Sequence, residues 1–281
     1  MRDGDARVTA LLAFEQVSVR YVVRSAWGTR ARTLDALQDV SLDVPEGGRL
    51  GVVGESGSGK STLARVALGF VPARAGGVRW CDREVSYGDR AALRALRREM
   101  QVVFQDPFGS LDPRMTAGAA IAEALLALSV ERVTPAEARD RVADSLDEVG
   151  LAPALADRYP HELSGGQCQR VAIARATIVR PRLLICDEAV SALDVSVQAQ
   201  VVNLLRDLSD RHRMALLFIS HNLAVVRHLC DDIAVLCQGR LVERGDRRQI
   251  FEAPRDLYTR ALLAAVPEPE PRRRHRAGDR E

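Results

Sequence analysis

The sequence predicts an α/β fold whose mostly parallel sheet is covered by helices on both faces. Short apolar runs typical of buried strands recur, with helical patterns between them, at 50–53, 102–104, 183–186, 216–220 and 233–236. A glycine-rich loop joins the first run to a helical pattern starting at Lys60, the order that a phosphate-binding loop requires. Between 106 and 163 the β-branched runs stop, which indicates a helical subdomain inserted into the core.

The N-terminal part has a β character of its own. Residues 1–7 are polar and expected to fray, whereas 14–21 alternate like a strand. The polar stretch 24–35 indicates a loop, and a second strand is expected at 40–44, ended by Pro45 and a glycine pair. These features predict an antiparallel β part ahead of the parallel sheet.

One helix of the insertion carries clear start and stop signals. Thr134 is the expected N-cap, Pro135 takes the first helical position, and Glu137 completes a capping box. Gly150 ends the same helix. The last fifteen residues of the chain have almost no apolar content, and we expect them to be disordered.

Composition limits the function classes. The net charge of +2 gives no general case for nucleic-acid binding. The five cysteines show neither CxxC pairs nor zinc spacing with histidine, which favours a reduced, cytosolic protein. The N-terminus predicts no signal peptide, and no apolar run approaches the roughly 20 residues that span a bilayer. Any role at a membrane would therefore depend on partner chains.

The strongest motif is the run from Gly54 to Ser61, which matches G-x-x-x-x-G-K-[ST]. Its glycines allow successive N–H groups to face phosphate oxygens, and the following helix adds its positive N-terminal dipole. Lys60 is the only lysine among the 40 basic residues, so this position requires a compact ammonium. We expect Lys60 to reach the β- and γ-phosphates of ATP and the Ser61 hydroxyl to ligate Mg²⁺. The expected nucleotide-binding residues here are Gly54, Glu55, Ser56, Gly57, Ser58, Gly59, Lys60, Ser61 and Thr62.

Two carboxylates end the apolar run at 183–186. Asp187 could hold Mg²⁺ through water, and Glu188 could polarise the water that attacks the γ-phosphate. An apolar run ending in Asp-Glu is weak alone, but it becomes specific when it follows a phosphate loop.

A second anion-binding terminus is expected at Leu163-Ser164-Gly165-Gly166-Gln167. Its two glycines expose N–H groups where a helix begins, which suits a phosphate. Ser164 lies more than 100 residues after Lys60. If both termini serve one ATP, they come from different chains of a head-to-tail dimer.

The order of these motifs resembles the ATP-binding cassette (ABC) family over about residues 14–245. The resemblance implies a P-loop NTPase core of the ABC ATPase type, with ATP and Mg²⁺ as cofactors. It also implies an ATP-binding domain over 8–252, with the helical subdomain inserted at about 106–163, and a C-terminal extension over 253–281.

The resemblance assigns four further residues by their motifs. Gln105 in VVFQDP corresponds to the hinge glutamine that senses Mg²⁺ and γ-phosphate, and His221 in FISHN to the histidine that contacts γ-phosphate. Asp194 in SALD resembles the loop that connects the two sites across the dimer. Tyr21 in VSVRY resembles the aromatic that stacks on adenine, with a half-buried strand tyrosine as the alternative.

Two segments are similar to the importers of dipeptides, oligopeptides and nickel: QDPFGSLDPR after the strand at 102–104 and YTRALLAAVP near the C-terminus. This similarity implies a heterodimer with a second ATP-binding subunit, two transmembrane permeases and an extracellular solute-binding protein, at the cytoplasmic face of the cell membrane. No cysteine follows Cys237, so we expect no iron–sulfur cluster.

Two alternatives remain open from the residues. An exporter cassette would carry the same chemistry. A soluble cassette ATPase that acts on DNA or ribosomes is less favoured, because the chain has one P-loop, no zinc spacing and no sustained heptads. The arginine run at 272–276 could touch nucleic acid or anionic lipid, but a solvated tail is the simpler interpretation, and we expect no direct nucleic-acid binding.

The sequence departs from the common family pattern at three places. Ala189-Val190 replaces a Pro-Thr pair after the expected catalytic glutamate. Cys168 replaces Arg or Gln, and Asn222 replaces Asp after the histidine. None of these changes removes a phosphate-binding, metal-binding or basic group.

Overall fold

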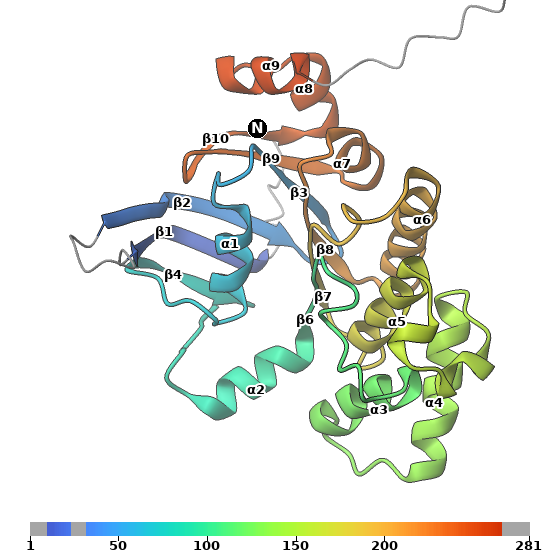
Figure 1. Ribbon diagram of the computed structural model, residues 1–281. Coiled ribbons are helices and arrows are strands. Elements are labelled where there is room, and N and C mark those ends of the chain that lie inside the picture. Colours follow the sequence, from blue (N-terminus) through green and yellow to red (C-terminus); the bar gives the residue numbers. More distant parts are fainter. Residues whose placement is uncertain (1–9, 24–31, 266–281) are drawn as a thin grey trace, which may run out of the picture.

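The computed structural model describes residues 10–23 and 32–265, and these form two sheets (Figure 1). In the six-stranded sheet the order is β10-β9-β3-β8-β7-β6, and only the β9–β10 pair is antiparallel. Its strands are β3 (Arg49–Val53), β6 (Met100–Val103), β7 (Leu183–Asp187), β8 (Ala215–Ile219), β9 (Asp232–Cys237) and β10 (Arg240–Asp246). The expected α/β fold with a mostly parallel sheet is confirmed.

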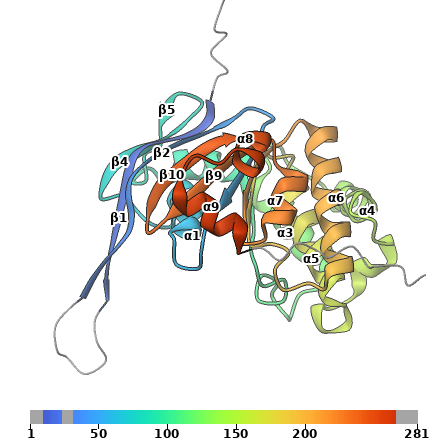
Figure 2. The same ribbon diagram turned by 90° about the horizontal axis from the view of Figure 1, so that it is seen from above.

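The second sheet is antiparallel and four-stranded, in the order β2-β1-β4-β5. Its strands are β1 (Ala10–Val23), β2 (Arg32–Pro45), β4 (Ala75–Trp80) and β5 (Arg83–Glu84). Figure 2 shows β1 and β2 running side by side away from the helices. The expected loop at 24–35 was too long at its C-terminal end, because 32–35 pair with β1 and Asp35 accepts hydrogen bonds from Arg20.

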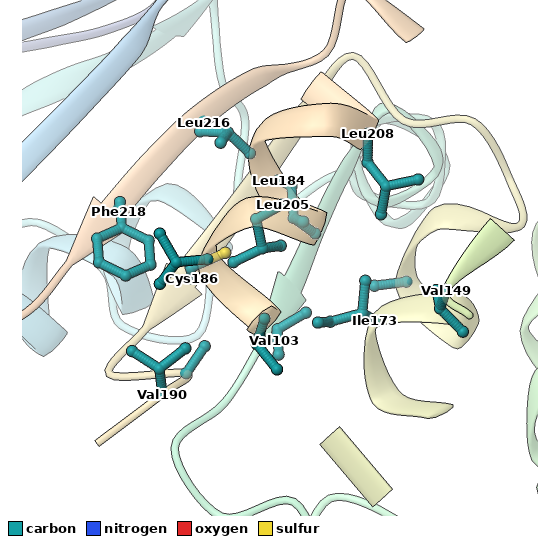
Figure 3. Close-up of a cluster of buried hydrophobic side chains, with 14 of the residues drawn as sticks. Val103, Val149, Ile173, Leu184, Cys186, Val190, Leu205, Leu208, Leu216 and Phe218 are labelled. Carbon is teal, nitrogen blue, oxygen red and sulfur yellow. The ribbon is translucent and has the colours of Figure 1, made fainter. Parts of the chain in front are cut away.

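Alternate residues of the parallel strands point into two separate cores. Leu184 and Phe218 belong to a cluster that also contains residues of α5 (Gly165–Thr177), α6 (Val195–His212) and α7 (Leu223–Leu229), as Figure 3 shows in part. Their neighbours Leu183 and Ile219 face the other cluster, with the antiparallel sheet, α1 (Lys60–Ala67) and α2 (Arg90–Glu99). Strands buried on both faces explain why each reads as a continuous apolar run.

Between β6 and α5 the described chain is helical, without strands. It contains α3 (Ala117–Leu128), α4 (Pro135–Glu148) and the short 3₁₀ helices η1 (Pro153–Asp157) and η2 (Pro160–Glu162). The capping box at Thr134 and Glu137 is present, and Gly150 follows α4 with φ +70°. The domain boundaries drawn from the sequence stay a prediction.

After β10 the chain forms α8 (Arg247–Glu252) and α9 (Leu257–Ala264), which lie beside β9 and β10 in both views (Figures 1 and 2). The expectations for 1–7, for the loop residues 24–31, for the last fifteen residues and for the arginine run fall outside the described residues. Among the helices that the structure describes, none is long and apolar enough to cross a membrane.

Candidate active site

The sequence-predicted motifs meet at one edge of the parallel sheet. Neighbouring strands are β3, β8, β7 and β6, and their carboxyl ends lie together because they are parallel. The P-loop follows β3, His221 lies just after β8, Asp187-Glu188 end β7, and Gln105 follows β6. Ligand sites of open α/β sheets form at such an edge.

Glycine is required at two P-loop positions by close backbone contacts. Gly54 has φ +150°, and a Cβ there would lie 2.1 Å from the Leu236 carbonyl oxygen. Gly59 is the N-cap of α1 and has φ +106°, and a Cβ there would lie 2.5 Å from the Ala36 carbonyl oxygen. The loop is therefore wedged between β9 and β2, in a curled conformation open to few other residues.

Lys60 is buried under this loop, with only 4% of its surface exposed. Its Nζ donates to the carbonyl oxygens of Gly54 at 2.8 Å and Glu55 at 2.7 Å. Burial lowers the pKa of Lys60, and the carboxylates of Glu188 and Asp187 oppose that shift. The ammonium is thus held at the phosphate loop by uncharged carbonyl acceptors, which a negatively charged phosphate oxygen could replace.

The fold brings together Ser61 and Asp187, which lie 126 positions apart in the sequence. The Ser61 hydroxyl donates to Oδ1 of Asp187 at 2.9 Å. Burial raises the pKa of Asp187, and the bond from Ser61 opposes the shift. Two oxygen ligands side by side at the end of a strand form a hard donor set of the kind that Mg²⁺ prefers.

Glu188 is held in an unusual backbone conformation, with φ +52°. Its N–H donates to the Ile219 carbonyl at 2.9 Å, and its carbonyl accepts from the Ser191 hydroxyl at 2.9 Å. The carboxylate lies 3.5 Å from Nδ1 of His221, with 20% of the Glu188 side chain and 58% of the His221 side chain exposed. The two backbone bonds hold Glu188 in this left-handed conformation and so fix the point from which its side chain extends.

The second expected phosphate site is the N-terminus of α5. Ser164 caps the helix by accepting from the Gln167 N–H at 3.2 Å, and the Gln167 side chain accepts from the Ser164 N–H at 2.9 Å. A Cβ on Gly166 would lie 2.6 Å from Val197 of α6, whereas one on Gly165 would lie 3.8 Å from its nearest neighbour, Phe108. Gly166 therefore allows close helix packing, and Gly165 leaves the surface open.

This difference predicts opposite outcomes for two alanine variants. Gly166→Ala should lower the free energy of unfolding by about 1–2 kcal/mol, because Val197 in a helix has few alternative rotamers. Gly165→Ala should leave unfolding unchanged, yet lower ATPase activity about tenfold or more by placing a methyl group on the phosphate-facing surface. Denaturant unfolding and steady-state ATPase of both variants test this. Equal activity of Gly165→Ala and the parent would contradict the second phosphate site.

Three further predicted site residues, Gln105, Tyr21 and Asp194, lie outside the Lys60, Ser61–Asp187 and Glu188–His221 contacts. Gln105 is exposed and lies two residues after the end of β6. The Tyr21 ring packs against the core beneath the antiparallel sheet, with its hydroxyl buried and no partner among the described residues. Asp194 caps α6, and hydrogen bonds from the Val197 N–H and the Ser196 hydroxyl keep its pKa low. The stacking of Tyr21 on adenine stays a prediction.

Two supports of the P-loop were not anticipated from the sequence. The Gly239 N–H, in the turn after β9, donates to the Ser58 carbonyl at 2.9 Å. The Tyr258 hydroxyl, on α9, accepts from the Glu55 N–H at 3.1 Å. Both residues lie some 180 to 200 positions from the loop, so no local pattern could have identified them.

The three departures from the family pattern are accommodated by packing and capping. Ala189 and Val190 are 1% exposed and join the core formed with α5 to α7. Cys168 is buried, with its Sγ 3.4 Å from the Pro160 carbonyl oxygen. Asn222 caps α7 by accepting from the Ala224 N–H at 3.1 Å, a role that an aspartate would also fill.

Comparison with protein families identifies the chain. Residues 37–191, more than half of it, match the family described as ABC transporter. The chain belongs to the ABC transporter family. Residues 242–281 of this cassette also match the family described as oligopeptide/dipeptide transporter, C-terminal region, which includes α8 and α9. The resemblance seen in the sequence is therefore confirmed, and the chain is an ABC-type ATPase that binds ATP.

Curated relatives of the cassette are transport ATP-binding proteins. It is 50% identical over 240 residues to the oligopeptide transport ATP-binding protein OppF of Escherichia coli (strain K12), a match that covers 85% of this chain and 72% of that protein. It is 46% identical over 272 residues to the glutathione import ATP-binding protein GsiA of Pectobacterium atrosepticum, covering 96% of this chain and 43% of that protein.

Solved structures confirm the fold class. The cassette superimposes with a TM-score of 0.75 and 28% identity on a dimeric post-hydrolysis state of the ATP-binding cassette MJ0796 bound to ADP and Pi. That match covers 84% of this chain and 99% of the other. The structure of cbiO1 from Clostridium perfringens, part of the ABC transporter complex cbiONQ, gives a TM-score of 0.74 at 26% identity, over 87% of this chain and 92% of that one.

Proposed function

We propose that this cassette is the ATP-hydrolysing subunit of a peptide importer and that it works at the cytoplasmic face of the membrane, bound to permease subunits. The single observation that carries the ATPase role is the meeting of Lys60, the Ser61–Asp187 pair and the Glu188–His221 pair at one sheet edge. The similarity to peptide and glutathione transport proteins, together with the match of 242–281, supports import of peptides over nickel.

The Ser61–Asp187 oxygen pair fits Mg²⁺, which would be held there by the Ser61 hydroxyl and, through water, by Asp187. The ion would neutralise charge on the β- and γ-phosphates of the substrate ATP. The P-loop amides and Lys60 bind and orient the phosphates. Gln105, at the end of β6, is proposed to read the same ion and phosphate.

Glu188 is the proposed general base, since its carboxylate can accept a proton from the attacking water. His221 lies 3.5 Å away and would contact the γ-phosphate while orienting this carboxylate.

The second phosphate surface, at Ser164, Gly165 and Gly166, would serve the ATP of a partner cassette in a head-to-tail dimer. Around the two glycines lie Phe108, Leu193 and Val197 rather than P-loop residues. Asp194, at the start of α6, would link the two sites. In the proposed assembly the chain forms a heterodimer with a second, non-identical cassette. Two permeases and an extracellular solute-binding protein complete it. Closure on ATP then converts binding energy into a movement of the permeases.

The proposal is tested first with the purified chain. We expect binding of ATP that requires Mg²⁺, measured by calorimetry with and without a chelator. Loss of all nucleotide affinity in the presence of Mg²⁺ would contradict the proposed site.

The transported class is tested in the native membrane. The tagged cassette, isolated with its membrane partners and reconstituted into vesicles, should show ATPase activity that rises with di- or oligopeptide and a solute-binding protein. A response to Ni²⁺ alone would replace peptides by nickel. Isolation without any membrane protein would contradict the transporter role and favour a soluble cassette ATPase.

A further inference from the structure

One residue of the P-loop, Glu55, is held on both of its peptide groups. Its carbonyl oxygen accepts from Lys60 Nζ at 2.7 Å, and its N–H donates to the Tyr258 hydroxyl at 3.1 Å. Tyr258 lies on α9, within the region 242–281 that matches the oligopeptide/dipeptide C-terminal family. That region therefore contacts the nucleotide site directly.

The start of α9, and with it Tyr258, is held by hydrogen bonds to Asp256 and to Glu243 of β10. Asp256 caps α9 and accepts from the Tyr258 N–H at 2.7 Å. Glu243 of β10, only 8% exposed, accepts from the N–H groups of Arg255 at 2.8 Å and Asp256 at 3.0 Å. Burial raises the pKa of Glu243, but the hydrogen bonds from the Arg255 and Asp256 N–H groups are among the causes that lower it below its ordinary value overall.

We infer that Tyr258 is a positioning residue for the binding of ATP. It anchors the P-loop through the Glu55 N–H, and the Glu243 carboxylate holds Tyr258 in place through the N–H groups of Arg255 and Asp256. The inference rests on the proposed binding of phosphates by this loop. When Lys60 turns from the Glu55 carbonyl to a phosphate oxygen, the Tyr258 bond remains and keeps the loop in its curled form. A loop ordered before the ligand arrives loses less entropy on binding, which increases affinity.

The effect should fall on ATP affinity and not on the chemical step. Tyr258 contacts the loop on the side of Glu55, whereas Asp187 is the proposed metal-binding residue and Glu188 and His221 are the proposed base and its neighbour. Removal of the hydroxyl therefore weakens the positioning of the loop and leaves the proposed base in place.

Tyr258→Phe is the direct test, because it removes one oxygen and keeps the ring. We expect the Kd and KM for Mg-ATP to rise about two- to tenfold, the size of one net hydrogen bond, with kcat near that of the parent. Tyr87→Phe is the matched control: its hydroxyl donates to the Val66 carbonyl at 2.7 Å, in the last turn of α1 and away from the loop. This control should keep the parent KM.

A double-mutant cycle tests whether Glu243 acts on the P-loop through Tyr258. Glu243→Gln removes the charge and should raise KM in the same direction. In the Tyr258→Phe background it should add little, since both changes act through one contact. Full additivity of the two changes would show that Glu243 does not act through Tyr258 and would overturn that step.

Hydrogen exchange of the nucleotide-free protein separates this inference from the proposed function. Amides of 54–60 should exchange faster in Tyr258→Phe than in the parent or in Tyr87→Phe. Unchanged exchange, or an unchanged KM, would overturn the inference. A parent chain without affinity for Mg-ATP would contradict the proposed function instead, while the exchange result would still decide whether Tyr258 anchors the loop.

Discussion

Glu188→Gln should bind Mg-ATP about as well as the parent and hydrolyse it at least about 100-fold more slowly. Glutamine keeps the size of the side chain, so the bonds from Glu188 N–H to Ile219 and from Ser191 to the Glu188 carbonyl should survive. It cannot accept the proton of the attacking water. Binding and turnover therefore separate in this variant.

A slow chemical step should also trap the closed dimer. Size-exclusion chromatography of Glu188→Gln in Mg-ATP, with the companion cassette present, should show a stable dimer that a chelator disperses. Single-turnover hydrolysis gives the rate of the chemical step without product release.

Glu131→Gln is the matched control, because Glu131 is exposed in the connection between α3 and α4, outside the site. It should keep the parent rate. Turnover of Glu188→Gln at the parent rate would remove Glu188 from the role of base and leave His221 as the nearest candidate.

The parts of the site that could be predicted from the sequence are those whose geometry is local. The curled loop before Lys60 and the helix start at Gly165-Gly166 each depend on a few consecutive residues, and both are present. The juxtaposition of Ser61 and Asp187 follows once β3, which leads into the P-loop, and β7, which ends at Asp187, lie parallel on either side of β8. The sequence identified Glu188 as a candidate residue but not its left-handed backbone conformation, because that conformation involves a hydrogen bond to Ile219 in another strand.

What the sequence did not reveal depends on partners far along the chain. Strand β4 is glycine-rich at its start and pairs with β1 through contacts some 60 residues apart, so it carries no strong local pattern. Residues 32–35, three of them polar, form a strand because β1 pairs with them. The contact of Tyr258 with Glu55 spans 203 residues, and only the folded arrangement of α9 reveals it.

Lys60→Met and Lys60→Arg should both lose ATPase activity by about 100-fold or more, with nucleotide affinity falling as well. A buried charge-assisted bond to a phosphate contributes much more than a neutral one, so its loss in Lys60→Met is severe. Arginine keeps the charge. It cannot, however, fit a site that is 4% exposed and shaped by carbonyls 2.7–2.8 Å from a single ammonium nitrogen.

The arginine variant gives the sharper result, because 39 of the 40 basic residues of this chain are already arginine. Lysine is kept only at position 60, where the loop leaves room for a compact ammonium. Arg248→Lys, at an exposed ion pair with Glu252, is the reciprocal control and should keep the parent activity. Unfolding midpoints near that of the parent would show that the loss in the Lys60 variants is not loss of fold. Parent-like turnover of Lys60→Arg would mean that the site requires only a positive charge, and the shape argument for this lysine would fail.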